Sequence, residues 1–216
     1  MSTNFFIFEN MKNTKDHILK TALDLFNADG LSKVTLRTIA NKMGISQGNL
    51  SYHYKKREEI IEALYFQLVG KVDENMSKGE GGTVGLQTMF GMSAVMMENL
   101  FEYRFFMLDF VQIMRESDKI RTHFLQLTKI REEQFSMLFS GLIEKGILRK
   151  EVLPNEYLFL YKRIQILGDF WISSAQITKP RLNKKMIKEY SEIINQTIFP
   201  YLTGAGKKEY CEIMKC

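Results

Sequence analysis

The sequence predicts an all-α fold, and three observations support this prediction. Apolar residues recur at intervals of three and four through most of the chain, which is the spacing of one helix face. Only 3 of the 216 residues are proline, so few positions oppose a helix. No segment of useful length alternates apolar and polar residues as a half-buried strand does. We expect about nine helices from these patterns.

The first helix is predicted upstream of Gly30. Ile18, Ala22 and Phe26 recur at helical spacing and form an apolar stripe. A polar pair at 13–14 offers a side chain that can cap the start of the helix. Gly30 suits the left-handed conformation in which many helices end. These signals predict one amphipathic helix between the polar pair and Gly30.

Two short helices follow, joined by a tight turn. Thr35 is a suitable N-cap for the second helix, and Gly44 ends it. Ser46 can cap the third helix, which continues to residue 52 or 54. Ala40 is small where the two helices must cross closely, and Ile45 fills the turn. Two short helices joined by a glycine-initiated turn of this length predict a helix-turn-helix.

The charge of this region has one sign, although the whole chain is only mildly basic, with a net charge of +5 and a pI near 9.0. A patch of one sign favours a polyanionic partner such as nucleic acid. The alternative is a solvated face whose acidic residues lie nearby in space. Between residues 31 and 57 there is no Asp or Glu, and the basic residues are Lys33, Arg37, Lys42, Lys55, Lys56 and Arg57.

Beyond residue 57 the sequence predicts helices with few interruptions. Glu58 and Glu59 suit the first turn of a fourth helix, because carboxylates stabilise the positive end of the helix dipole. Glycines in the segment 77–83 interrupt the pattern and predict a linker. We expect a three-helix helix-turn-helix domain at residues 12–57, a larger helical domain at 58–203, and flexible tails at 1–11 and 204–216.

The N-terminal helices contain several motifs in one register. They are Phe26 and Gly30 at the end of the first helix, Thr35-x-x-x-Ile39-Ala40, Gly44-Ile45-Ser46, Tyr52-His53-Tyr54 and Arg57-Glu58-Glu59-Ile60. With these motifs, residues 14–65 resemble the DNA-binding region of the TetR-type (TetR/AcrR) transcriptional regulators. The remainder resembles the family only in the number and length of its helices. Three positions depart from the family pattern, which commonly has tyrosine at Ser51, phenylalanine at Tyr54 and lysine at Arg57.

The resemblance implies a sequence-specific DNA-binding regulator, and the third helix carries the residues suited to reading bases. Gln47 and Asn49 have carboxamides that can pair with the N6 and N7 edge of adenine. Gly48 permits close approach of the backbone to the duplex, or it reflects loose turn geometry. By resemblance, Arg37 reaches a base edge or a phosphate; the alternative is a solvated arginine.

Contacts to the DNA backbone are expected around the same helix. Ser51 offers less reach than tyrosine. His53 either faces DNA or a hinge, or it packs between the first and fourth helices. The residues expected to contact DNA are Thr35, Arg37, Thr38, Gln47, Gly48, Asn49, Ser51, Tyr52, His53, Lys55 and Lys56.

The resemblance also implies a small-molecule site in the larger domain. The segment 86–114 is rich in methionine and phenylalanine, which can line an adaptable apolar cavity or simply pack a core. We expect an apolar or amphipathic effector; Arg104 and Arg115 would instead favour an anion. Candidate pocket residues are Met92, Met96, Phe106, Asp109, Phe110, Gln112 and Trp171, with Asp109 and Gln112 placed to orient the ligand.

A homodimer is expected, because two recognition helices about 34–36 Å apart match successive major grooves of a pseudo-palindromic operator. The interface is sought in the last two long helices, residues 155–175 and 184–201. The first of these has apolar residues on more faces than one core contact requires. The alternative is a fully buried central helix in a monomer.

Several other function classes lack their sequence signals. The chain contains no Walker loop, dinucleotide fingerprint, G-x-S-x-G or histidine-rich metal pattern. We therefore expect no catalytic residue, metal or cofactor, and the pair Cys211 and Cys216 is only weak evidence for a metal. No signal peptide or membrane span is found, so a cytoplasmic protein is expected. The resemblance implies a repressor, because most members of the resembling family repress. The alternative is a helical protein-interaction module that retains the helix-turn-helix as a scaffold and has no ligand response.

Overall fold

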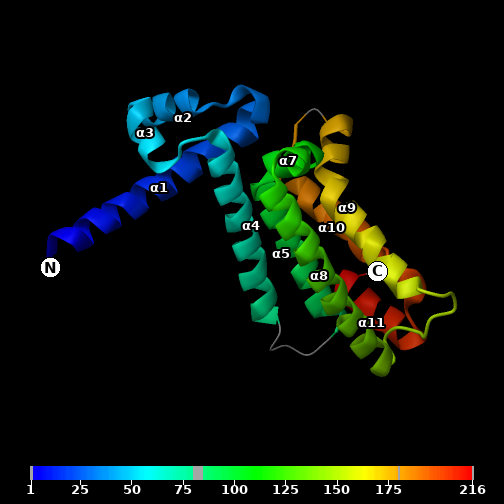
Figure 1. The fold of residues 1–216 in the computed structure, drawn as a ribbon. Helices are drawn as coiled ribbons and strands as arrows, with labels where there is room; N and C mark the ends of the chain where they lie inside the picture. The colour runs from blue at the N-terminus through cyan, green and yellow to red at the C-terminus, as the bar shows by residue number, and fades with distance from the viewer. Residues whose placement is uncertain (1, 80–84, 180, 216) are drawn as a thin grey trace. The chain divides into compact units, whose positions relative to one another are not determined.

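The computed structural model of the protein describes residues 2–79, 85–179 and 181–215, without the side chains of 2–12 and 77–79. Over these ranges the chain forms eleven α-helices and two short 3-10 helices, and the only β-type pairing is an isolated bridge between Leu148 and Leu202 (Figure 1). The all-α fold is confirmed. The chain divides into two compact units, residues up to 70 with 103–120, and residues 71–102 with those from 121 onward.

The first unit begins with the expected three-helix arrangement. Ile18, Ala22 and Phe26 are all buried on the long first helix, so its apolar stripe is the core face. The elements of this unit are α1 (Ser2–Asp29), η1 (Leu31–Lys33), α2 (Leu36–Met43), α3 (Gln47–His53), the first turns of α4 (Arg57–Gly79), α6 (Arg104–Leu108) and α7 (Phe110–Glu116).

The segment 103–120 belongs to the first unit because its aromatic rings pack against α1 and α4. Phe105 stacks on Phe26 of α1, with ring centroids 5.0 Å apart. Phe106 stacks on Tyr65 of α4 at 5.3 Å. The backbone N–H of Phe105 also donates to Oδ1 of Asn27 at 3.0 Å, which fixes the start of α6 against the end of α1. Helices α1 and α4 therefore share their core with a segment distant in sequence.

The second unit is a helical bundle with its own aromatic core. Trp171 is 2% exposed and its ring lies 6.2 Å from Phe101 and 5.2 Å from Tyr190, so it joins three helices. These helices are α5, α9 and α10. The elements of the unit are the last turns of α4, α5 (Leu86–Glu102), α8 (Asp118–Glu144) beyond its first turn, α9 (Glu156–Thr178), α10 (Lys185–Gln196), η2 (Phe199–Tyr201) and α11 (Gly204–Met214).

The apolar run after α5 forms two short helices, α6 and α7. Asp109 ends α6 and begins α7, with φ −104° and ψ 19°. Its N–H donates to the carbonyl of Phe105 at 3.1 Å, and its carbonyl accepts from Ile113 at 2.9 Å. One residue thus closes one helix and opens the next, which an apolar run in the sequence does not indicate.

The segment 204–216, expected to be a flexible tail, instead forms α11 up to Met214. Tyr210 is 4% exposed in the core of the second unit. A Cβ added to Gly206 would lie 2.2 Å from the carbonyl oxygen of Ile147, so α11 approaches the backbone more closely than any other residue type allows. The linker expected at 77–83 lies partly outside the described residues, since α4 continues to residue 79 and 80–84 are not described.

Candidate nucleic-acid interface and ligand cavity

The helix-turn-helix is built by caps at both ends of its turn. Ser46 Oγ accepts the backbone N–H of Asn49 at 3.1 Å and so caps α3. Gly44 ends α2 in the left-handed region at φ 68°, which a side chain would disfavour. Ile45 N donates to the carbonyl of Ala40 at 3.1 Å and closes the turn. The residue types at these positions therefore set the direction in which α3 leaves α2.

The N-terminus of α2 carries a reciprocal capping box whose two hydroxyl groups differ in what they can still bind. Thr35 N donates to Oγ1 of Thr38 at 2.9 Å, and Thr38 N donates to Oγ1 of Thr35 at 3.2 Å. The Thr38 hydroxyl also donates its single proton to the carbonyl of Thr35 at 2.9 Å. A hydroxyl has one proton to donate. Thr35 can therefore still donate to a phosphate oxygen, whereas Thr38 must first lose its bond to the backbone.

The expected reading face of α3 is exposed to solvent. Leu50 is fully buried and anchors the helix. Gln47, Gly48 and Asn49 in the first turn are all exposed. Tyr52 is 72% exposed, which is unusual for a large ring and leaves its face and hydroxyl accessible to a partner. One face of α3 thus holds the protein together and the opposite face is accessible.

The basic residues of this region have two different roles. Lys55 and Lys56 are exposed at the junction of α3 and α4. Arg57 is instead turned inward, and its guanidinium donates to the carbonyl of Leu31 at 3.0 Å. Glu59 accepts the backbone N–H of Lys55 at 2.8 Å, so an acidic side chain does lie near the patch. The exposed cations of the patch are Lys33, Arg37, Lys42, Lys55 and Lys56.

Ser51 and His53 are only partly accessible. The His53 ring packs edge-on against Tyr52, with centroids 5.3 Å apart. Its Nδ1 is buried and has no hydrogen-bond partner among the described residues. The structure therefore places eleven predicted contact residues in and around α2 and α3, with nine of them exposed and these two half-buried.

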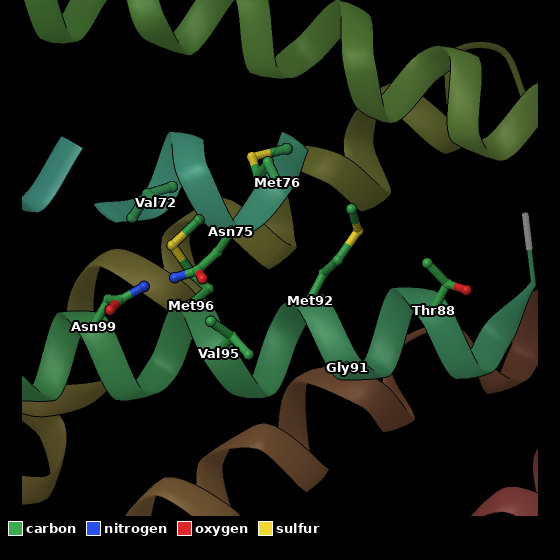
Figure 2. Close-up of a pocket in the computed structure, with 9 residues that line it drawn as sticks. All are labelled: Val72, Asn75, Met76, Thr88, Gly91, Met92, Val95, Met96 and Asn99. Carbon is green, nitrogen blue, oxygen red and sulfur yellow. The ribbon is translucent and has the colours of Figure 1, made fainter. Parts of the chain in front are cut away.

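A cavity of about 300 Å³ lies in the second unit between the end of α4 and α5 (Figure 2). Both helices contribute apolar and amide side chains to it, and none of its lining residues is ionisable. These residues are Val72, Asn75, Met76, Thr88, Gly91, Met92, Val95, Met96 and Asn99.

Only two of the seven predicted effector residues, Met92 and Met96, line this cavity. Trp171 packs in the aromatic core of the second unit. Phe106, Asp109, Phe110 and Gln112 belong to the first unit, where Gln112 Nε2 donates to Glu116 at 2.8 Å. The burial of Asp109 raises the pKa of its carboxyl group.

The cavity lining also contains residues that were not predicted from the sequence, namely those of α4 and Asn99 of α5. The latter had a signal, because positions 92, 96 and 99 repeat at intervals of four and three and so share one face of a helix. A polar residue on a methionine-lined face indicates a site rather than a core. The contribution of α4 depends on packing between helices and had no local signal.

The capped turn, the exposed tip of α3 and the lysines beside it define a helix-turn-helix protein. The model of the tetR family of bacterial regulatory proteins matches residues 18–64, and that of a bacterial transcriptional repressor, TetR, matches residues 67–210. The second match alone covers more than half of the chain. The chain belongs to the TetR family, whose members are transcriptional regulators and not enzymes.

Relatives of the chain are similar to it over different lengths. The HTH-type transcriptional regulator YerO of Bacillus subtilis (strain 168) is 20% identical over 178 residues, 78% of this chain and 62% of that protein. The class D tetracycline repressor of Escherichia coli is 30% identical over 57 residues, 26% of either chain. This chain thus spans less than two thirds of the length of both proteins.

A crystal structure of a TetR-family regulator from Marinobacter aquaeolei VT8 has the same fold, with a TM-score of 0.84 at 22% identity. The comparison covers 94% of this chain and 97% of that one. Within the described ranges, no helix has the length and apolar character needed to cross a membrane.

Proposed function

We propose that the protein is a repressor that binds a pseudo-palindromic DNA operator as a homodimer and responds to a small molecule. The observation that carries this proposal is the accessible tip of α3, where Gln47, Gly48 and Asn49 are exposed while Leu50 fixes the helix from behind. Two exposed carboxamides on either side of a glycine suit the base edges in the major groove of a duplex, and the exposed lysines beside them suit its phosphates.

Each contact has a chemical role in the proposal. Gln47 and Asn49 pair with adenine edges, and each good pair discriminates by about 1–3 kcal/mol. Lys55 and Lys56 bind phosphates without sequence preference. Thr35 is the better phosphate donor of the two capping threonines, because its hydroxyl proton is not used in the capping box. Tyr52 and Arg37 are exposed and complete the contact surface.

The proposed dimer is supported by a row of exposed apolar side chains on α9. Phe159, Ile166, Phe170 and Ile177 are 49%, 60%, 42% and 86% exposed. At about 100° per residue, their positions point within about 20° of one direction. Such a row needs cover in water, and a second copy of the same row provides it around a two-fold axis. Ile193 of α10 is 44% exposed and would extend the interface.

The proposed response depends on α4. This helix is continuous from Arg57 to Gly79. It begins directly after the basic junction formed by Lys55 and Lys56, and its later turns supply Val72, Asn75 and Met76 to the cavity. A ligand that favours one position of α4 changes the spacing of the two recognition helices. Ligand and DNA affinities are then coupled reciprocally, typically by about 1–3 kcal/mol. A regulator of this kind acts in the cytoplasm, where its DNA is.

The proposal is tested by mobility shifts and anisotropy titrations with duplex DNA from upstream of the protein's own reading frame. Affinity should fall steeply with salt, because lysines release counterions from phosphates. Lys56→Ala should weaken binding to every sequence and reduce the salt slope by about 0.9 for each protomer, or about 1.8 for the dimer. Lys208→Ala, an exposed lysine of α11, is the matched control and should change neither quantity. Binding that is absent or indifferent to salt would favour a protein-interaction module instead.

A further inference from the structure

One end of the cavity has a buried amide group without a partner. Asn99 is 8% exposed, and its Nδ2 is buried with no hydrogen-bond partner among the described residues. Leaving such a donor unsatisfied costs about 1–3 kcal/mol. Figure 2 shows the nitrogen end of Asn99 turned toward that of Asn75, which also lines the cavity. A ligand acceptor at this end of the cavity would satisfy the buried donor of Asn99.

The rest of the cavity is apolar and elongated. Met76, Met92 and Met96 line its middle, and thioether side chains adapt to flexible apolar chains. Thr88 lies at the opposite end of α5 from Asn99 (Figure 2). The step of eleven residues from Thr88 to Asn99 corresponds to about 16 Å along the helix axis, at a rise of about 1.5 Å per residue. The shape matches a chain with one polar end.

The described residues bring no charge into the cavity that could balance an ionic ligand. None of its lining residues is ionisable. Two charged groups of α4 beside the lining residue Val72 are paired, since Lys71 Nζ lies 2.6 Å from Glu102 and Asp73 pairs with Arg131 of α8. An unpaired ion would lose its hydration in this cavity without compensation. The site therefore favours an uncharged ligand.

We propose that the cavity binds an elongated, uncharged molecule with a carbonyl oxygen at one end, and that Asn99 donates the hydrogen bond that orients it. The flexible apolar chain of this molecule lies along the three methionines toward Thr88. The inference rests on the proposed function in using the same cavity, and it adds the chemical class of the ligand and the residue that selects it.

The test compares four probes that each contain ten carbon atoms in one unbranched chain. They are decan-2-one, decane, decanoate and decylammonium. Calorimetric titration of the full-length protein should show decan-2-one binding at least about tenfold more tightly than the other three, the effect of one buried hydrogen bond. Asn99→Leu should reduce ketone binding to the level of decane. Asn99→Asp, which keeps the shape and adds a charge, should shift the preference toward decylammonium.

Three results would overturn the inference: no ketone binding to the wild type, tighter binding of either ion, or ketone binding unchanged in Asn99→Leu. The emission of Trp171 checks that each variant is folded, and the probe series on the wild type stands even if a variant fails this check.

Operator binding without probe is measured in the same samples and separates the two proposals. Ketone binding that does not release DNA supports the ligand class and contradicts only the proposed response. Operator release by decanoate in preference to the ketone supports the response and overturns the ligand class.

Discussion

The tip of α3 and the cavity beside α5 are two proposed binding surfaces, and they are built in opposite ways. The tip consists of consecutive exposed residues, 47–49, held by local hydrogen bonds. The cavity is formed by side chains of α4 and α5, which are not consecutive in the sequence. A surface that reads a partner from outside is encoded locally, whereas a cavity exists only after the helices have packed. The two surfaces also belong to different compact units, so they can be perturbed separately.

The largest effect is expected from Phe105→Ala. Phe105 is 1% exposed and stacks on Phe26 within the first unit. Loss of its ring should lower the free energy of unfolding by about 3–5 kcal/mol. The only tryptophan, Trp171, reports on the second unit, whereas circular dichroism reports on all helices. In urea, the dichroism transition of the variant should therefore begin below that of tryptophan fluorescence.

The reverse substitution is Phe139→Ala, since Phe139 is 2% exposed in the core of the second unit. It should shift the fluorescence transition first. If both variants shift both signals together, the two units unfold as one and the comparison of separate regions fails.

An intermediate effect is expected from Gln47→Ala on DNA recognition. Loss of one bidentate base contact should reduce the preference for the operator over unrelated duplexes by about 1–3 kcal/mol. The free energy of unfolding should stay within about 0.5 kcal/mol, because Gln47 is exposed. Competition titrations with operator and scrambled duplexes measure the preference. Gln126→Ala, an exposed glutamine of α8, is the control, and an equal loss in both variants would contradict base reading by Gln47.

A smaller effect is expected from the pH dependence of stability in the second unit. Burial raises the pKa of Asp169 to about 7, whereas an unfolded aspartate titrates near about 3.9. Between these values the folded protein keeps a proton that the unfolded chain has lost. The contribution of this group to the free energy of unfolding is therefore present at low pH and is lost as pH rises through this range.

Asp169→Asn should remove that contribution. Melting temperatures at pH 5 and pH 8 should then differ less in the variant than in the wild type. The exposed Asp29→Asn serves as control. A wild-type pH dependence retained in full by Asp169→Asn would contradict the burial of this carboxyl group.

The smallest effect is expected from two matched glycine substitutions. A Cβ at Gly48 would meet only Ser46 Oγ at 3.9 Å, and one at Gly168 of α9 would meet nothing within 4 Å. Alanine should therefore stabilise either helix by up to about 1 kcal/mol. Only Gly48→Ala should weaken operator binding, because its methyl group would stand between backbone and duplex. If operator affinity is unchanged in Gly48→Ala, the glycine is not needed for close approach to the duplex and only reflects the geometry of the turn.

The parts of the structure that follow from local chemistry were predictable from the sequence. Thr35, Gly44 and Ser46 fix α2, the turn and α3 through caps that act within a few residues. The helix α11 was not predictable, because its Gly-Ala-Gly start has the composition of a linker and its reason is the close approach of Gly206 to Ile147. Asn75 was not predictable for the same reason, since its place in the cavity depends on how α4 packs on α5, whereas Asn99 shares a helix face with Met92 and Met96.

The seven residues of α3 include one buried side chain, that of Leu50. A helix this short is not stable on its own, so its position is set by that single anchor and by the caps at its ends. The other side chains of the helix contribute little to folding. Operator preference is therefore a trait that can diverge between duplicated genes one substitution at a time, while the scaffold that presents it stays the same.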